Sequence, residues 1–337
     1  MHIVGLPVAV IGAGSFGTCL ALLCGRENDV RLWSRSAEVA LAINREHRNP
    51  HYLRETVLPD SVWATASLEE ALAGSEMVIC AVPSHGVREV MAQAAPHLSP
   101  ESILVSAVKG LEFETGMTMH QVLEDVLPAV HHPRIVCLSG PSFAHEIARK
   151  LPTVVTLACR EEAYAISVQA TLSCPWFRCY SNTDVIGVEI GGALKNVIAI
   201  AVGIGDGMRQ GHNSRAALMT RGLAEITRLG LRLGAERSTF LGLAGMGDLL
   251  LTCTGDLSRN RRVGLALGRG QDLDDILKEM GEVAEGVQTT RAVCRLAERL
   301  DVDMPISNMV RQVIDGERTP AEAGRLLMTR QLRSERD

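Results

Sequence analysis

The 337-residue chain has 46% hydrophobic and 22% charged side chains, a balance that is ordinary for a folded globular protein and excludes a disordered or low-complexity chain. Its formal net charge of -5 excludes a global positive field for nucleic acid or anionic lipid, so any basic site must be local. The nine cysteines are scattered and form no CxxC pair, which favours a reducing compartment. No signal peptide or membrane span is evident, and we expect a cytoplasmic protein without integral membrane association.

The first half of the chain alternates short apolar runs with stretches of helical spacing. The runs are rich in β-branched residues and continuously apolar, as expected for strands covered on both faces. Strands are predicted at 7–12, 29–34, 76–83, 102–108, 134–140 and 153–159. Helices are predicted at 16–25, 68–72, 87–95, 117–127 and 143–149. This alternation predicts a doubly wound, mostly parallel α/β sheet of Rossmann type over residues 1–182.

After Asn182 the apolar spacing becomes helical. The stretch SNTD at 181–184 supplies helix-capping residues where the period changes. Helical spacing without a convincing strand extends over 184–205, 214–232, 237–251, 260–268, 272–280, 288–300, 305–315 and 320–328. The sequence therefore predicts an all-helical second domain over residues 183–337, which we expect to carry substrate-binding and catalytic residues.

A glycine-rich loop follows the first predicted strand. In VAVIGAGSFG, the residues Gly12, Gly14 and Gly17 form a GxGxxG pattern just before a predicted helix. Gly12 permits a tight turn, Gly14 lets the backbone approach a pyrophosphate, and Gly17 lets the helix pack closely on the strand. The amides and dipole of the helix N-terminus favour the same group. The loop therefore predicts a dinucleotide cofactor, NADP(H) or NAD(H); a glycine turn without a ligand is the alternative.

The end of the second predicted strand bears on the choice of coenzyme. An NAD-selective site usually has an acidic residue there for the ribose hydroxyls, whereas RLWSRS offers Ser34 and Arg35. The Arg35 guanidinium could bind a 2′-phosphate through two hydrogen bonds, or it could be a solvated surface residue. We expect NADPH to be bound at least as well as NADH.

Two lysines have settings that suit chemistry. Lys109 follows the strand at 102–108, and ligands of doubly wound sheets bind outside the carboxyl ends of the strands. The stretch LSGPS at 138–142 ends a later strand in the same way. Lys195 lies in EIGGALKNVIAIAVGIGDG, which is otherwise apolar and rich in small residues. Burial would lower its pKa toward neutrality and suit proton transfer. The alternative is a lysine whose ammonium reaches solvent past its small neighbours.

The stretch GMGDLLLTCTGDLSRNRRVG at 245–264 is the other polar segment of note. Asp248 lies between glycines and an apolar run, where a carboxylate usually needs a cationic partner. Residues 258–262 form a basic, hydrogen-bonding cluster at a predicted helix start, which suits a phosphate of substrate or cofactor. Nucleic acid is less favoured as a partner, because the cluster is small and lacks aromatic residues. No histidine or cysteine cluster has metal-ligand spacing, so we expect no bound metal.

Several longer stretches resemble the bacterial NAD(P)-dependent glycerol-3-phosphate dehydrogenases. They run in that family's order from residue 8 to near residue 290: VIGAGSFGT, AVPSH, SAVKGLE, LSGPSFAHEIA, EIGGALKNVIAIAVGI, NSRAALMTRGLAEI, LAGMGDLLLTCTGDLSRNRRVG and AEGVQT. The resemblance implies an enzyme that interconverts dihydroxyacetone phosphate and sn-glycerol 3-phosphate and so feeds phospholipid synthesis. It also implies a homodimer.

The resemblance further implies roles for individual residues. Lys195 matches the family's proton acceptor in alcohol oxidation, and so the proton donor in ketone reduction. Asp248 would hold this lysine in position. The implied substrate contacts are Lys109, Gly140, Ser142, Lys195, Asn196, Asp248, Thr252, Ser258, Arg259 and Asn260. The implied cofactor contacts are Gly12, Gly14, Ser15, Phe16, Gly17, Arg35, Lys109, Ala144, Arg259, Val283 and Glu285.

The sequence departs mildly from the family. Phe16 stands where the family often has Trp or Tyr, so ring stacking is kept and a hydrogen-bond donor is lost. The position of Arg35 varies within the family, and the C-terminal end matches weakly. Two alternatives stay open: a dehydrogenase of the 3-hydroxyacid or 6-phosphogluconate type, which shares the domain order and a helix lysine, and a non-catalytic NADPH-sensing protein.

Overall fold

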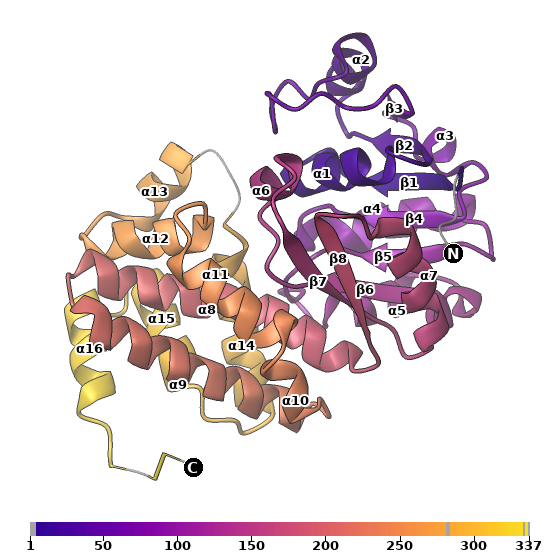
Figure 1. Cartoon of the computed structure of the whole chain (residues 1–337). Helices are drawn as coiled ribbons and strands as arrows, with labels where there is room; N and C mark the ends of the chain where they lie inside the picture. Colours follow the sequence, from indigo (N-terminus) through magenta and orange to yellow (C-terminus); the bar gives the residue numbers. More distant parts are fainter. Residues whose placement is uncertain (1–4, 281–283, 333, 336–337) are drawn as a thin grey trace.

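The computed structural model describes residues 5–280, 284–332 and 334–335. Its N-terminal half is an eight-stranded sheet in the order β3-β2-β1-β4-β5-β6-β7-β8 (Figure 1). All neighbouring strands are parallel except β6 and β7. The strands are β1 (Pro7–Ile11), β2 (Asp29–Trp33), β3 (Val62–Thr65), β4 (Met77–Cys80), β5 (Ile103–Ser106), β6 (Ile135–Ser139), β7 (Thr153–Ala158) and β8 (Phe177–Asn182). The strand order reverses between β1 and β4, which opens a crevice at their carboxyl ends.

Helices cover both faces of this sheet, and each face has its own apolar core. On one face lie α1 (Ser15–Cys24), α2 (Ala37–Glu46), α6 (Ala144–Ala148) and α7 (Glu162–Leu172). On the other lie α3 (Leu68–Leu72), α4 (Val87–Ala94) and α5 (Met119–Val126). Short 3₁₀ turns complete the connections at η1 (Ser84–Gly86), η2 (Ala95–His97) and η3 (Ala129–Arg134). Burial on both sides explains why the strands are continuously apolar.

The predicted Rossmann-type fold class is confirmed, and all six predicted strands are present with slightly shorter bounds. Sequence analysis missed β3, β8, α2 and α7. The edge strand β8 alternates between buried and exposed residues, with Tyr180 on the exposed side, so it lacks the continuous apolar run used to find the others. β3 is only four residues long and exposes Trp63, and α2 buries only Val39, Ala40 and Ile43.

The described residues after Asn182 form helices and connecting turns, as predicted. Asp184 caps the first of them, since its Oδ1 accepts a hydrogen bond from the Gly187 amide at 2.8 Å. The elements are α8 (Val185–Gly207), α9 (Gly211–Arg232), α10 (Arg237–Phe240), the π-turn η4 (Leu243–Gly247), α11 (Asp248–Thr254), α12 (Arg259–Gly268), α13 (Leu273–Met280), α14 (Glu285–Arg299), α15 (Pro305–Ile314) and α16 (Pro320–Met328).

Helix α8 is the central element of the second half. It is long and apolar enough to cross a membrane, yet 89% of its most apolar window is buried inside the protein. Figure 1 shows α8 running from the sheet into the other helices, with α9, α11 and α12 beside it. The predicted all-round coverage of this helix is confirmed, because its residues from Val188 to Gly205 are all buried.

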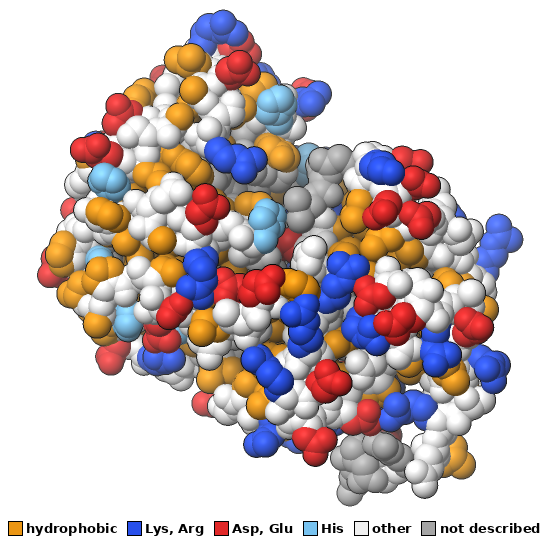
Figure 2. All heavy atoms as spheres, turned by 180° about the vertical axis from the view of Figure 1, so that it is seen from behind, with side chains coloured by type: hydrophobic (Ala, Val, Ile, Leu, Met, Phe, Trp, Pro, Cys, Tyr) orange, Lys and Arg blue, Asp and Glu red, His pale blue; other side chains and the backbone are white. Residues whose placement is uncertain are grey.

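Figure 2 shows acidic and basic side chains interspersed over one face of the molecule. On the described part of this face, neither charge covers a continuous area. This distribution agrees with the absence of a global positive field expected from the net charge of -5.

Glycines bring α8 and α12 into direct backbone contact. A Cβ on Gly203 would lie 2.2 Å from the Arg261 carbonyl oxygen, and a Cβ on Gly264 would lie 2.1 Å from the Ile200 carbonyl oxygen. One turn further on, Gly207 and Gly268 make contacts of the same kind with the facing helix. The two helices therefore have almost no freedom to shift relative to one another without losing contact.

We predict that Gly264→Ala lowers the free energy of unfolding by roughly 1–3 kcal/mol, because the facing carbonyl oxygen belongs to the backbone of a buried helix and cannot move aside. Alanine's higher helix propensity, about 1 kcal/mol, is too small to compensate. Denaturant titration measures the change. Gly86→Ala is the matched control, since a Cβ there meets no atom within 4 Å. Wild-type stability in the Gly264 variant would contradict the close-packing argument.

Candidate active site

Two lysines from the two halves of the chain share one buried carboxylate. The Lys195 Nζ of α8 donates to Asp248 Oδ1 at 2.5 Å and to the Thr252 hydroxyl at 3.0 Å. The Lys109 Nζ, beyond the end of β5, donates to Asp248 Oδ2 at 2.7 Å. The Asp248 side chain is 1% exposed. This lysine–aspartate cluster thus joins the sheet to the helical half through a single acid.

The ends of β5 and β6 position Lys109. Its ammonium also donates to the Gly140 carbonyl at 2.8 Å and lies 3.4 Å from the Ser142 hydroxyl. Gly140 adopts a φ of +134°, which side chains rarely tolerate, and a Cβ there would lie 3.0 Å from the Val155 Cα. The turn after β6 therefore directs a carbonyl at the lysine, and it brings together three residues that sequence analysis assigned to substrate binding.

Helix α8 can pack closely against the sheet because two residues near its start, Gly191 and Gly192, have no side chain. A Cβ on Gly192 would lie 2.5 Å from the Ser139 hydroxyl at the end of β6, and one on Gly191 would lie 2.6 Å from the Ala244 carbonyl in η4. The π-turn η4 leads directly into Asp248, the first residue of α11. Such turns are frequent at functional sites, since the extra residue redirects the side chains that follow.

Burial and charge set the protonation of the cluster. Burial lowers the pKa of Lys195 from 10.5 to about 8, with Lys109 acting in the same direction and Asp248 opposing both. Burial by itself would raise the pKa of Asp248, yet the two ammonium groups outweigh it and hold this pKa below its usual value. Near neutral pH the site therefore holds a carboxylate between two ammonium groups, and Lys195 can lose its proton more easily than an ordinary lysine.

The glycine loop has the geometry that its sequence predicts. Gly12 has a φ of +114° and would place a Cβ 2.8 Å from the Ala81 carbonyl, while a Cβ on Gly17 would collide with the Gly12 carbonyl. Gly14 precedes α1 and has no atom within 4 Å of its Cβ position. No side chain caps the N-terminus of α1. Open space beside uncapped amides fits the pyrophosphate of a dinucleotide.

The other predicted cofactor residues lie around this loop or in the helical half. Ser15 and Phe16 form the first turn of α1, and Ala144 begins α6, which packs beside α1. Arg35 is exposed just after β2. Val283 lies outside the described residues.

Glu285 connects the two halves of the chain. It begins α14, and its Oε1 accepts a hydrogen bond from the Ser84 amide, in the turn after β4, at 3.2 Å. Burial raises the pKa of its carboxyl, which the neighbouring Ser84 amide and Arg259 oppose. Sequence analysis did not identify Ser84 as a contact. Every residue except proline has a backbone amide that can donate, so the residue type does not reveal this contact.

The basic start of α12 lies next to the lysine helix. The Ser258 hydroxyl caps α12 by accepting from the Arg261 amide at 3.2 Å. Asn260 Oδ1 accepts from the Gly286 amide at 2.9 Å, and a Cβ on Gly286 would lie 3.0 Å from the Asn196 carbonyl. Gly286 therefore links Asn260 of the predicted phosphate cluster to the part of α8 next to Lys195.

Two further observations limit the site. Within residues 5–280, 284–332 and 334–335, no group of three or more His, Cys, Asp or Glu side chains could hold a metal ion, and the expectation of no metal stays a prediction.

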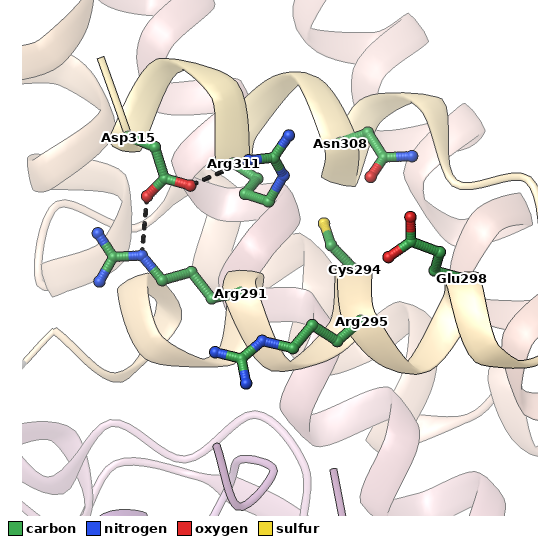
Figure 3. A pocket seen from close by; sticks show the side chains of 7 residues that line it. All are labelled: Arg291, Cys294, Arg295, Glu298, Asn308, Arg311 and Asp315. Atoms are coloured by element: carbon green, nitrogen blue, oxygen red, sulfur yellow. Dashed lines mark hydrogen bonds and ion pairs between the residues drawn. The ribbon is translucent and has the colours of Figure 1, made fainter. Parts of the chain in front are cut away.

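A hollow of about 400 Å³ lies between α14 and α15 and shares no residue with the lysine–aspartate cluster (Figure 3). Two of its arginines, Arg291 and Arg311, pair with Asp315 at 2.8 and 3.1 Å, and Arg311 also pairs with Glu317 at 2.6 Å, so their charge is largely neutralised.

The doubly wound sheet, the open glycine loop and a buried lysine at the carboxyl ends of the strands define a two-domain dehydrogenase that uses a nicotinamide dinucleotide. The chain belongs to the NAD-dependent glycerol-3-phosphate dehydrogenase family. The N-terminal model of that family matches residues 7–165, and its C-terminal model matches residues 184–325.

Relatives cover nearly the whole chain. A glycerol-3-phosphate dehydrogenase [NAD(P)+] of Myxococcus xanthus is 52% identical over 97% of this chain and 98% of its own length. One of Geobacter sulfurreducens is also 52% identical, over 98% of both chains. The crystal structure of glycerol-3-phosphate dehydrogenase from Coxiella burnetii superposes with a TM-score of 0.92 at 37% identity, covering 97% of this chain and 99% of that one. A ketopantoate reductase from Ralstonia eutropha, at 13% identity and a TM-score of 0.62, shares the fold alone.

We predict that Asp248→Asn lowers the free energy of unfolding by about 3–5 kcal/mol near neutral pH, because two largely buried ammonium groups lose their counter-charge. Denaturant titration measures the loss. Asp256→Asn is the matched control, since that carboxylate also contacts a cation, Arg261, but its side chain is 97% exposed.

The loss should shrink as the pH rises toward about 8. Without Asp248, which raises the pKa of Lys195, the folded variant releases this proton at a lower pH than the wild type does, and stability rises with pH wherever the unfolded state binds more protons. From about 8 to the ordinary lysine value of 10.5 both proteins gain stability alike, so the difference between them should stay constant there. An Asp248 variant as stable as the control, at every pH, would contradict the arrangement of charges.

Proposed function

We propose that this protein catalyses the interconversion of dihydroxyacetone phosphate and sn-glycerol 3-phosphate with NADPH or NADH. The observation that carries the proposal is the buried Lys195 ammonium, 2.5 Å from Asp248, on a helix against which the basic start of α12 packs. The names of the whole-length relatives support the substrate pair. A dehydrogenase of the 3-hydroxyacid or 6-phosphogluconate type is not favoured, because the family match covers both halves of the chain.

The bound nicotinamide supplies or accepts the hydride, and the chain's own residues do the rest. Gly12, Gly14, Gly17 and the first amides of α1 hold the pyrophosphate, and Phe16 stacks beside it. Arg35 faces the adenosine end, and Glu285 with Arg259 lies at the domain junction. The open space at Gly14 and the uncapped helix start support this assignment.

Lys195 acts as the general acid and base. In reduction, the C2 carbonyl carbon gains a hydride while its oxygen takes a proton from the Lys195 ammonium; oxidation reverses both transfers. A pKa of about 8 leaves the ammonium protonated at neutral pH, yet able to release its proton. Asp248 holds the lysine, and Lys109 orients the ketone oxygen beside it. The shared carboxylate at 2.5 and 2.7 Å supports this division of roles.

The substrate's phosphate is bound by Arg259 and Asn260 at the capped start of α12. This contact lies away from the reacting carbon, so its binding energy can orient the ketone toward Lys195. The remaining proposed substrate contacts are Gly140, Ser142, Asn196, Thr252 and Ser258. Gly140, Ser142 and Thr252 lie against the two lysine ammonium groups, which supports their assignment.

In the cell the reaction would supply the glycerol backbone of phospholipids from a cytoplasmic homodimer. The cytoplasmic location is supported by the cysteines, all nine of which are free thiols, eight of them buried. The proposal includes no nucleic-acid partner and no metal.

Replacing the lysine tests the chemistry. We expect Lys195→Met to reduce kcat by at least about a thousandfold, because positioned proton transfer and the charge beside the developing alkoxide are both lost. The reduced nicotinamide's absorbance follows turnover with dihydroxyacetone phosphate. NADPH affinity, measured by fluorescence titration, should change little. Near-normal turnover would refute the role of Lys195, and wild-type protein that binds NADPH without turnover would indicate the non-catalytic sensor instead.

Coenzyme choice is tested at Arg35. We expect Arg35→Gln to raise KM for NADPH by roughly tenfold while KM for NADH changes less than about twofold, because a charge-assisted contact to the 2′-phosphate is worth about 1.5–3 kcal/mol. Arg48→Gln, another substitution of an arginine in the same half of the chain, is the control. A strong NADH preference in the wild type would contradict the role given to Arg35.

A further inference from the structure

A buried aspartate lies at the far end of the helix that carries Lys195. Asp206 is three turns beyond the lysine, and its side chain is 8% exposed. Arg261, from α12, donates to Asp206 Oδ2 through Nε at 3.1 Å and Nη2 at 2.8 Å. Arg215, from α9, donates to Asp206 Oδ1 through Nε at 2.9 Å. One carboxylate thus holds two neighbouring helices to the end of α8.

Arg261 belongs to the turn that starts α12. It follows Arg259 and Asn260 directly, and its amide is the one that Ser258 caps. Its guanidinium is directed at carboxylates, because Nη1 donates to Asp256 at 3.1 Å while the other two nitrogens contact Asp206. Arg261 is therefore committed to holding the helix, and the phosphate contacts are left to its two neighbours.

The ion pair adds a polar restraint to the packing of α8 on α12. Gly203 and Gly264 bring the two backbones together near the Arg261 carbonyl, and Val263 and Leu267 of α12 are buried in the same apolar core as α8. This packing fixes the distance between the two helices. The first turn of α12 begins before Gly264, and the two-point contact of the Arg261 guanidinium with Asp206 restrains that turn against α8.

We propose that Asp206 is a positioning residue for the substrate's phosphate: through Arg261 it fixes the first turn of α12, and with it Arg259 and Asn260, relative to Lys195. This inference rests on the proposed function. Since Lys195 and Asp206 are on the same rigid helix, the distance between the proton donor and the phosphate contacts is set within one pair of packed helices.

The role predicts an effect on binding of the phosphorylated substrate and little effect on the chemical step. In Asp206→Asn, we expect KM for dihydroxyacetone phosphate to rise about tenfold while kcat stays within about twofold, because the phosphate contacts lose their alignment and Lys195 keeps its partners. The inhibition constant of inorganic phosphate, the probe for this contact, should rise by a similar factor. KM for NADPH should rise far less, because Arg259 is only one of many proposed cofactor contacts.

Arg215→Gln is the matched control, because it removes the other guanidinium from Asp206 and leaves Arg261 in contact with it. Its KM for dihydroxyacetone phosphate should equal that of the wild type. Arg261→Gln should reproduce the Asp206→Asn effect, and the double variant should be no worse than either single one, as for residues that act as one unit. If Asp206→Asn fails to fold, Arg261→Gln carries the test with the same readouts.

Three outcomes would overturn the inference: an unchanged KM for dihydroxyacetone phosphate in both variants, an equal rise in the Arg215 control, or a parallel rise in KM for NADPH, which would indicate general loosening. A different result would refute the proposed function. Wild-type protein without turnover of dihydroxyacetone phosphate refutes that function, whereas an active wild type with unaffected variants refutes only the role of Asp206.

Discussion

The carboxylate of Asp248 is the interaction on which the arrangement of the molecule depends. It is almost fully buried and contacts the ammonium groups of Lys109 and Lys195, which come from opposite halves of the chain. Removing the carboxylate leaves two ammonium groups buried without compensation, which is far more costly than the intact cluster is favourable. The docking of the helices on the sheet and the charge of Lys195 therefore both depend on this carboxylate.

Helix α8 fixes the position of Lys195 relative to the sheet and to α12. At its start, Gly191 and Gly192 leave room for the π-turn η4 and the end of β6. Its middle carries Lys195, and its end packs on α12 through glycines. Because a helix is stiff over this length, groups that bind different parts of a substrate keep fixed spacing.

Much of this could be predicted from the sequence, and the limits have physical reasons. The continuous apolar runs identified the buried strands, and the apolar, small-residue surroundings of Lys195 marked this lysine as a candidate for proton transfer. Without the fold, however, a lysine that reaches solvent explained the same pattern. The partner at Asp248 is separated from Lys195 by 53 residues, so only the packed structure brings the two together.

Other features left weaker signals. The strand β8 lies at the edge of the sheet and alternates between buried and exposed residues, so the search for continuous apolar runs passed over it. The contact between Glu285 and the Ser84 amide involves backbone, which any residue provides. Arg261 was predicted as part of a basic cluster that suits a phosphate, and Asp206 carried no prediction; only the folded structure shows that the two are paired.

The apolar character of α8 has a consequence during synthesis. Until the later helices emerge from the ribosome and cover it, a 23-residue segment with the hydropathy of a membrane span is exposed to the cell's insertion machinery and to other nascent chains. Near its middle stands Lys195, and a lysine at the centre of a membrane helix costs about 3 kcal/mol to insert. The charge that pairs with Asp248 in the folded protein thus also disfavours insertion of the unfinished chain into the bilayer.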